Sequence, residues 1–159
     1  AVVFNNGTIV GIVPKLHLPN YKEFYEKRWF ISGYDLPEPT LNINGTEVPV
    51  GSNILFTDHN NPNIVMGIEI CEDIWMPIPP SSVLALRGAN VLVNLSASNE
   101  IVGKAAYRKD LVAMQSAKTI SAYVYVSCGV HESTTDVVFS GHSLIAKWNC
   151  DCRVPSLRS

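Results

Sequence analysis

The sequence predicts a mixed α/β fold, and three observations support this prediction. Short apolar runs typical of buried strands alternate with segments that have helical spacing. Hydrophobic residues make up 47% of the 159 residues and charged residues only 16%, so the chain can bury a substantial core. Its length suits one domain, and the sequence contains no internal repeat or low-complexity tract.

The first fifty residues predict two hairpins with an aromatic-rich segment between them. Strands over 1–4 and 8–13 flank Asn5-Asn6-Gly7, whose residues favour the positive backbone angles of a tight turn. Residues 21–30 can form a helical turn. Residues 34–49 contain three prolines and the turn Asn44-Gly45, which indicate a loop with a small hairpin of the kind that often covers a substrate.

The rest of the chain predicts most of the sheet. Strands are expected over 53–57, 63–70, 91–95, 122–127, 137–139 and 143–146. Pro77 to Pro80 argue against a helix, and Ser81-Ser82 are expected to cap a short helix that runs to Arg87 and ends at Gly88.

A longer helix is expected over 104–120, because its apolar residues recur with helical spacing. The residues expected on its apolar face are Tyr107, Leu111, Met114 and Ala117. The residues expected to face water are Arg108, Lys109, Asp110 and Lys118.

Cys71 is a candidate nucleophile, because the apolar strand over 63–70 stops on this thiol and is followed by Glu72 and Asp73. A strand that ends in a sharp turn exposes the reactive atom rigidly and leaves backbone N–H groups, here that of Glu72, to bind an oxyanion. The alternative is a cysteine that packs as a small hydrophobic residue.

Lys15 is a candidate partner of that nucleophile. It directly follows the strand over 8–13 and precedes the aromatic, charged segment over 21–30. A compact cation in this place can stabilise a thiolate or an oxyanion. The alternative is a surface lysine beside a strand.

These segments together resemble the nitrilase superfamily, and more closely the glutamine-hydrolysing domain of glutamine-dependent NAD synthetases. The resemblance covers residues 1 to about 145 and includes Leu18 to Tyr21, Glu23 to Phe30, Asn94 to Ser98, Glu132 to Asp136 and Gly141 to Ile145. It implies an αββα sandwich over 1–146, incomplete because N-terminal strands and helices are missing. It also implies Cys71 as nucleophile, Lys15 as catalytic lysine, and substrate contacts from Tyr21, Glu26, Ser98 and Lys104.

The implied reaction is hydrolysis of glutamine through a cysteine thioester, with the ammonia passed to deamido-NAD. The implied partners are glutamine, further copies of the chain in a homo-oligomer, and a C-terminal synthetase domain that would use ATP, Mg and deamido-NAD. No cofactor or metal is expected in this domain itself. The family's general base is a Glu upstream of the Lys15 strand, in a part that this sequence does not contain, so the chain alone is expected to be inactive. The alternatives are a stand-alone amidase, such as an ω-amidase or carbamoylase, and an inert fragment.

Composition excludes several other classes. A net charge of −2 without blocks of like charge argues against a nucleic-acid partner. No apolar run approaches the length of about 20 residues that spans a membrane, and no signal peptide opens the chain, so a cytoplasmic protein is expected. The cysteines at 71, 128, 150 and 152 lack paired zinc spacing, and Cys128 is expected to be a buried structural thiol. The four histidines are assigned no metal or acid–base role.

Residues 147–159 depart from the family and are expected to form a divergent tail. DNA for the Asn-Gly turn and apolar strand of the family can be written so that a shifted frame reads Trp-Asn-Cys-Asp-Cys, as found at 148–152. We therefore hypothesise a frameshift, with the natural protein continuing into a synthetase domain. The alternative is a genuine tail in which Cys150 and Cys152 form a metal or redox pair.

Overall fold

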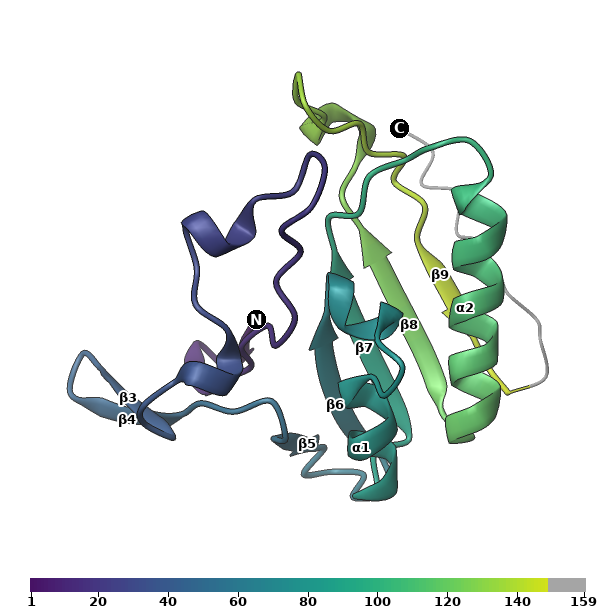
Figure 1. Cartoon of the computed structure of the whole chain (residues 1–159). Helices are drawn as coiled ribbons and strands as arrows, with labels where there is room; N and C mark the ends of the chain where they lie inside the picture. The colour runs from purple at the N-terminus through teal and green to yellow at the C-terminus, as the bar shows by residue number, and fades with distance from the viewer. Residues whose placement is uncertain (149–159) are drawn as a thin grey trace.

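A computed structural model describes residues 1–148, which contain a five-stranded mixed sheet with two α-helices on one of its faces (Figure 1). The strand order is β5 (Leu55–Thr57), β6 (Val65–Ile70), β7 (Val91–Ser96), β8 (Ala122–Ser127) and β9 (Leu144–Ala146). β6, β7 and β8 are parallel, and the outer strands β5 and β9 pair antiparallel with them. The crossover connections contain α1 (Pro80–Leu86) and α2 (Lys104–Thr119). The carboxyl ends of three strands therefore meet at one edge of the sheet.

The N-terminal region, residues 1–50, lies beside the sheet and contains two separate hairpins (Figure 1). The first joins β1 (Val2–Asn5) to β2 (Thr8–Ile12), and the second joins β3 (Thr40–Ile43) to β4 (Thr46–Pro49). Both turns are the predicted Asn-Gly pairs, with φ of 50° and 76° at Asn6 and Gly7 and of 51° and 83° at Asn44 and Gly45. Between the hairpins lie two 3-10 turns, η1 (Glu26–Arg28) and η2 (Gly33–Asp35), so the expected helical turn over 21–30 is confined to η1.

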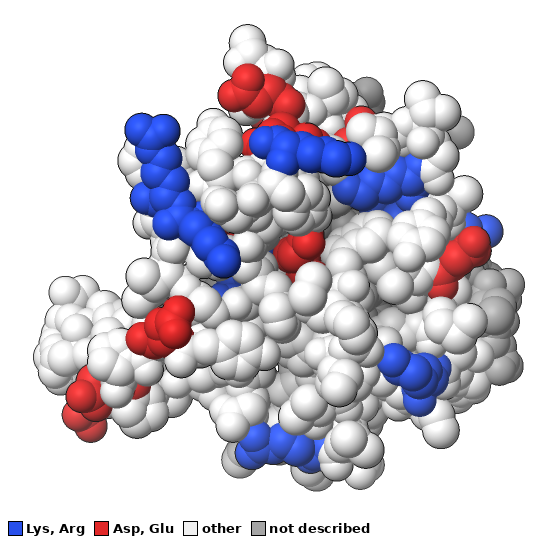
Figure 2. Space-filling view, viewed as in Figure 1, with Lys and Arg blue, Asp and Glu red and all other residues white. Residues whose placement is uncertain are grey.

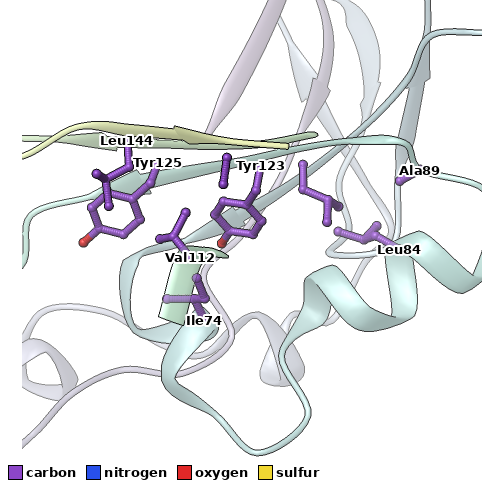
Figure 3. Packing of buried hydrophobic residues seen from close by; sticks show 9 residues of the cluster. Ile74, Leu84, Ala89, Val112, Tyr123, Tyr125 and Leu144 are labelled. Atoms are coloured by element: carbon purple, nitrogen blue, oxygen red, sulfur yellow. The ribbon is translucent and has the colours of Figure 1, made fainter. Parts of the chain in front are cut away.

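The core fills the space between the sheet and the helices (Figure 3). Alternate residues of the parallel strands point into it, and Leu92, Tyr123 and Tyr125 are fully buried. Gly67 on β6 allows α1 to approach closely, because a Cβ at this position would lie 3.0 Å from Cβ of Leu84. Burial of this apolar face holds the carboxyl edge of the sheet in place.

The predicted face of the long helix was partly wrong: Leu111 packs against the core, and Lys109, Asp110 and Lys118 are exposed as expected, but Tyr107, Met114 and Arg108 are not placed as expected. The residues of α2 that are buried are Arg108, Val112, Gln115 and Ser116, whereas Tyr107 and Met114 are 62% and 67% exposed. Hydrogen bonds explain the difference. The Arg108 guanidinium donates to Glu100 at 2.8 Å, and Gln115 donates to the hydroxyls of α1. Polar side chains that make such hydrogen bonds can therefore occupy the face that packs on the sheet.

Two further predictions were wrong. Residues 137–139 form no strand, because hydroxyls of the preceding segment take up their backbone groups: Val137 N–H donates to Thr134 Oγ1 at 3.1 Å, and Phe139 N–H donates to Ser133 Oγ at 3.0 Å. The short helix begins at Pro80 instead of after a Ser81-Ser82 cap. Proline is well suited to this first position, where its missing N–H would have no partner in the helix.

The expected tail over 147–159 lies almost wholly outside the described residues, including Cys150 and Cys152 and most of the segment of the frameshift hypothesis. Among residues 1–148 no helix has the length and apolar character needed to cross a membrane. The face shown in Figure 2 carries scattered charges of both signs rather than one basic patch.

Candidate active site

Cys71 lies where β6 turns into the 3-10 segment η3 (Cys71–Trp75), at the carboxyl edge of the sheet. Its φ is 49°, a left-handed conformation that is uncommon for a residue with a side chain. The buried amide of Asn94 on β7 holds this turn from both sides. Asn94 Oδ1 accepts from Cys71 N–H at 3.1 Å, and Asn94 Nδ2 lies 3.4 Å from Cys71 O. The thiol is therefore fixed at the strand end, as the sequence predicts.

Lys15 lies just after β2 in the N-terminal region, and its ammonium is paired with Glu26. Lys15 Nζ is 2.7 Å from Glu26 Oε1 and 2.5 Å from Oε2. The two side chains are only 13% and 27% exposed. Lys15, Glu26 and Cys71 line the same open cavity of about 620 Å³. The structure thus brings together a thiol, a cation and a carboxylate from segments far apart in the sequence.

A second, smaller cavity of about 210 Å³ also reaches Cys71. Its lining includes three residues expected to contact substrate, namely Tyr21, Ser98 and Lys104. The Tyr21 hydroxyl donates to Glu72 at 2.9 Å, and partial burial together with this bond raises the pKa of Tyr21 to about 12. This phenol is therefore a neutral hydrogen-bonding group near pH 7.

The lining of the smaller cavity includes an aromatic ring beside a cation. Lys104 Nζ lies 5.4 Å from the centre of the Trp75 ring and donates to Asn99, which in turn donates to Glu23. Burial and the nearby Arg108 guanidinium lower the pKa of Lys104. A pocket with a cation, carboxylates, a phenol and a stacking surface suits a small zwitterion such as an amino acid.

Glu69, the other carboxylate of β6, lies in neither cavity. It is 2% exposed, and its Oε2 accepts from Ser81 N–H at 2.7 Å while Oε1 accepts from the Tyr123 hydroxyl. Burial raises the pKa of Glu69. Its contacts link β6 to α1 and β8, so it supports the sheet beneath the nucleophile.

Sequence reasoning missed three contributions to this site. The roles of Asp73 and Asn94 were not predicted, because the backbone N–H groups that they bind in other segments lie 56 and 57 residues away for Asp73 and 23 residues away for Asn94. Cys128 was expected to be buried, but it lies just beyond the end of β8, is only partly buried and lines the larger cavity. Burial and the neighbouring Glu132 raise the pKa of Cys128.

No group of three or more His, Cys, Asp or Glu side chains within residues 1–148 is arranged to hold a metal ion. The arrangement that is present suits nucleophilic chemistry. It offers a thiol at a strained turn, a cation in the same cavity, and the Glu72 N–H at the start of η3.

The sequence and fold of this chain are similar to those of known proteins. Over 145 residues the chain is 44% identical to the glutamine-dependent NAD(+) synthetase of Mycobacterium bovis, which covers 91% of this chain and 21% of the relative. It is 36% identical over 146 residues to the enzyme of the same name from Thermotoga maritima, covering 91% of this chain and 22% of the relative. The crystal structure of a glutamine-dependent NAD(+) synthetase from Cytophaga hutchinsonii matches with a TM-score of 0.75 and 31% identity, over 90% of this chain and 22% of that chain.

This chain therefore spans about one fifth of the length of these relatives. The family model for carbon-nitrogen hydrolase matches residues 1–151, nearly the whole sequence. The chain belongs to the carbon-nitrogen hydrolase family, the nitrilase superfamily, and is related to the hydrolase domain of glutamine-dependent NAD synthetases.

Proposed function

We propose that this chain forms the glutamine-hydrolysing site of a glutamine-dependent NAD synthetase. The observation that carries the proposal is the position of Cys71, which lines both the cavity that contains Lys15 and the smaller cavity that suits an amino acid. The relatives named as glutamine-dependent NAD synthetases support the choice of substrate. A protein of the relatives' length that contains this chain is called the full-length protein below.

In the proposed reaction the Cys71 thiolate attacks the side-chain amide carbon of glutamine. A carbon–sulfur bond forms, and the carbonyl oxygen becomes an oxyanion that Lys15 and the Glu72 N–H stabilise. Collapse of this intermediate breaks the carbon–nitrogen bond and releases ammonia after protonation of the nitrogen. Water then cleaves the glutamyl thioester to glutamate and restores the thiol. The ammonia would be used to amidate deamido-NAD in a synthetase domain with ATP and Mg, outside this chain.

Substrate orientation is assigned to the smaller cavity. Lys104 would bind the α-carboxylate of glutamine, with Ser98 beside it, and Trp75 would cover the aliphatic part of the substrate. Tyr21 would act as a neutral hydrogen-bond donor or acceptor. The side-chain amide would then extend toward Cys71, the residue common to both cavities.

The reaction also needs a proton acceptor. Within residues 1–148, Glu26 is the carboxylate that lines the larger cavity, and it is paired with Lys15. Glu69 lies outside the cavity and accepts hydrogen bonds from Ser81 and Tyr123. We propose that Glu26 orients Lys15 and that an upstream glutamate of the full-length protein is the base. Glutamine turnover by residues 1–159 alone, equal to that of a form extended upstream, would contradict this assignment.

Replacement of the nucleophile tests the proposed function. In the full-length protein, Cys71→Ala should abolish glutamine-dependent NAD synthesis and leave ammonia-dependent synthesis largely intact, because only ammonia production needs the thiol. Cys128→Ala is the matched control, since Cys128 lines the same cavity and has no assigned role in the reaction. Equal loss of both activities in Cys71→Ala would contradict the proposal. Hydrolysis of an N-carbamoyl amino acid in preference to glutamine would instead indicate a stand-alone amidase.

A further inference from the structure

A buried carboxylate joins the two segments that carry the proposed catalytic pair. Asp73, two residues after Cys71, has a side chain that is 1% exposed. Its Oδ1 accepts from His17 N–H at 2.9 Å and lies 2.8 Å from His17 Nδ1. Its Oδ2 accepts from Ile70 N–H at 3.1 Å and lies 3.5 Å from the N–H of Leu16. One carboxylate therefore contacts both sides of the site.

The contacts to His17 and Leu16 span 56 and 57 residues of sequence. Leu16 and His17 directly follow Lys15, and Ile70 directly precedes Cys71. Bonds from backbone N–H groups to a carboxylate are stronger than those between neutral groups, and a buried carboxylate is costly without them. The buried Asp73 carboxylate is therefore fully stabilised only when Leu16 and His17, the residues after Lys15, stay where they can donate to it. Residues 14–18 are called the Lys15 segment below.

The Lys15 segment has other hydrogen bonds, but they run within the N-terminal region. Gly33 N–H donates to Lys15 O at 2.8 Å, and the Ser32 hydroxyl donates to Leu16 O at 2.6 Å. Among the described residues, the hydrogen bonds between 14–18 and 70–75 all end on Asp73. Between these two ranges the polar connection is therefore concentrated on one side chain, and the Tyr21–Glu72 hydrogen bond lies outside them.

We propose that Asp73 is a positioning residue that sets Lys15 against Cys71. It acts through the backbone of Leu16 and His17, and it contacts neither the Lys15 ammonium nor the thiol. This inference rests on the proposed function, because it requires Lys15 and Cys71 to act together. Without the carboxylate, Lys15 remains paired with Glu26 but loses its fixed distance from the nucleophile.

Glu69 provides a matched control. It lies two residues before Cys71, as Asp73 lies two residues after it, and both carboxylates are almost fully buried. The contacts of Glu69 go to Ser81 and Tyr123 and do not include the Lys15 segment. Glu69→Gln can keep both contacts: its amide oxygen can accept from Ser81 N–H, and its amide nitrogen can donate to the Tyr123 hydroxyl, which both donates and accepts. The pair separates a positioning effect from the general loss of a buried carboxylate.

The test is a double-mutant cycle on the reactivity of Cys71 in the full-length protein. The rate of iodoacetamide alkylation at pH 7.5 is followed by mass spectrometry of the peptide that contains Cys71, which distinguishes it from Cys128. Lys15→Met is introduced into the wild type, into Asp73→Asn and into Glu69→Gln. A cation beside a thiolate raises its reactive fraction, so Lys15→Met should slow alkylation about tenfold in the wild type.

The proposal expects that this effect of Lys15→Met falls to less than about twofold in Asp73→Asn and stays about tenfold in Glu69→Gln. The same factor in Asp73→Asn as in the wild type would overturn the role of Asp73 while leaving the catalytic pair in place. Absence of any Lys15 effect in the wild type would overturn the pair itself, and the positioning role with it. The two failures are therefore distinguishable.

A second measurement covers the case in which Asp73→Asn folds poorly. His17→Ala removes the ring contact to Asp73, together with an edge-on contact to the Tyr34 ring, from a side chain that is 26% exposed, and we expect it to weaken the Lys15 effect partially. Hydrogen exchange should also be faster at the amides of residues 16–17 in Asp73→Asn, with β7 and β8 still protected. Unchanged protection of residues 16–17 in a folded Asp73→Asn variant would contradict the proposal.

Discussion

The sheet region and the N-terminal region hold their functional residues in different ways. Around β6, β7 and β8 the core residues Leu92, Tyr123 and Tyr125 are fully buried. In residues 1–50 large side chains such as Trp29 and Tyr34 are 67% and 68% exposed. The nucleophile thus comes from a tightly packed sheet, whereas the lysine comes from a region with much less apolar burial. A site of this kind needs specific contacts to fix the second residue relative to the first.

The N-terminal region does contain a small core of its own. Val13 and Val48 are 1% and 2% exposed, and an isolated bridge joins Ile12 to Val50. Gly33 packs so closely that an added Cβ would lie 2.8 Å from Cγ of Pro14. This packing keeps the Lys15 segment together but does not by itself place it against Cys71. Three predictions test this difference between the two regions.

The largest expected effect comes from Lys15. In the full-length protein Lys15→Ala should lower glutaminase turnover at least about 100-fold, the scale of losing one oxyanion donor or cation from an active site. Lys15→Arg should also fail, because a planar guanidinium does not replace a point charge. The measurement is steady-state release of ammonia from glutamine. A rate near that of the wild type in Lys15→Ala would show that this lysine has only a structural role.

Truncation of a side chain should lower the free energy of unfolding more in the sheet region than in the N-terminal region. Leu92→Ala removes a fully buried side chain from the sheet core and should lower the free energy of unfolding by about 2–5 kcal/mol. Tyr34→Ala, at a side chain that is 68% exposed, should change it by less than about 0.5 kcal/mol. Urea unfolding of both variants checks this. Equal losses would mean that the N-terminal region is as tightly packed as the sheet.

The smallest effect concerns pH and Glu69. Burial raises the pKa of Glu69, so the native state keeps a proton that the unfolded state has already lost. Its contribution to stability is therefore fully present below the unfolded pKa of 4.5 and is lost as the pH rises through the raised native pKa. Glu69→Gln should lose less stability than the wild type over this range. Urea unfolding between about pH 4.5 and 8 measures both proteins, and parallel curves would contradict the expectation.

Much of the site could be predicted from local sequence. The strand that stops at Cys71, the lysine after the first hairpin and the two Asn-Gly turns each depend on the type and spacing of a few adjacent residues. The backbone conformation of a tight turn and the end of a buried strand are decided within such short segments. The sequence also determined the family, because several ordered segments carry its motifs.

Tertiary structure alone decided which polar side chains are buried and what they hold. Arg108 was expected to face water, yet it is fully buried because Glu100 and His142, 8 and 34 residues away, take its hydrogen bonds. Asp73 became the connection to the Lys15 segment through partners 56 and 57 residues away. The sequence shows the spacing of apolar residues and the chemistry of each side chain, but it does not show which distant residues become hydrogen-bond partners. Burial of a charged group depends on such partners, because without them its desolvation is too costly.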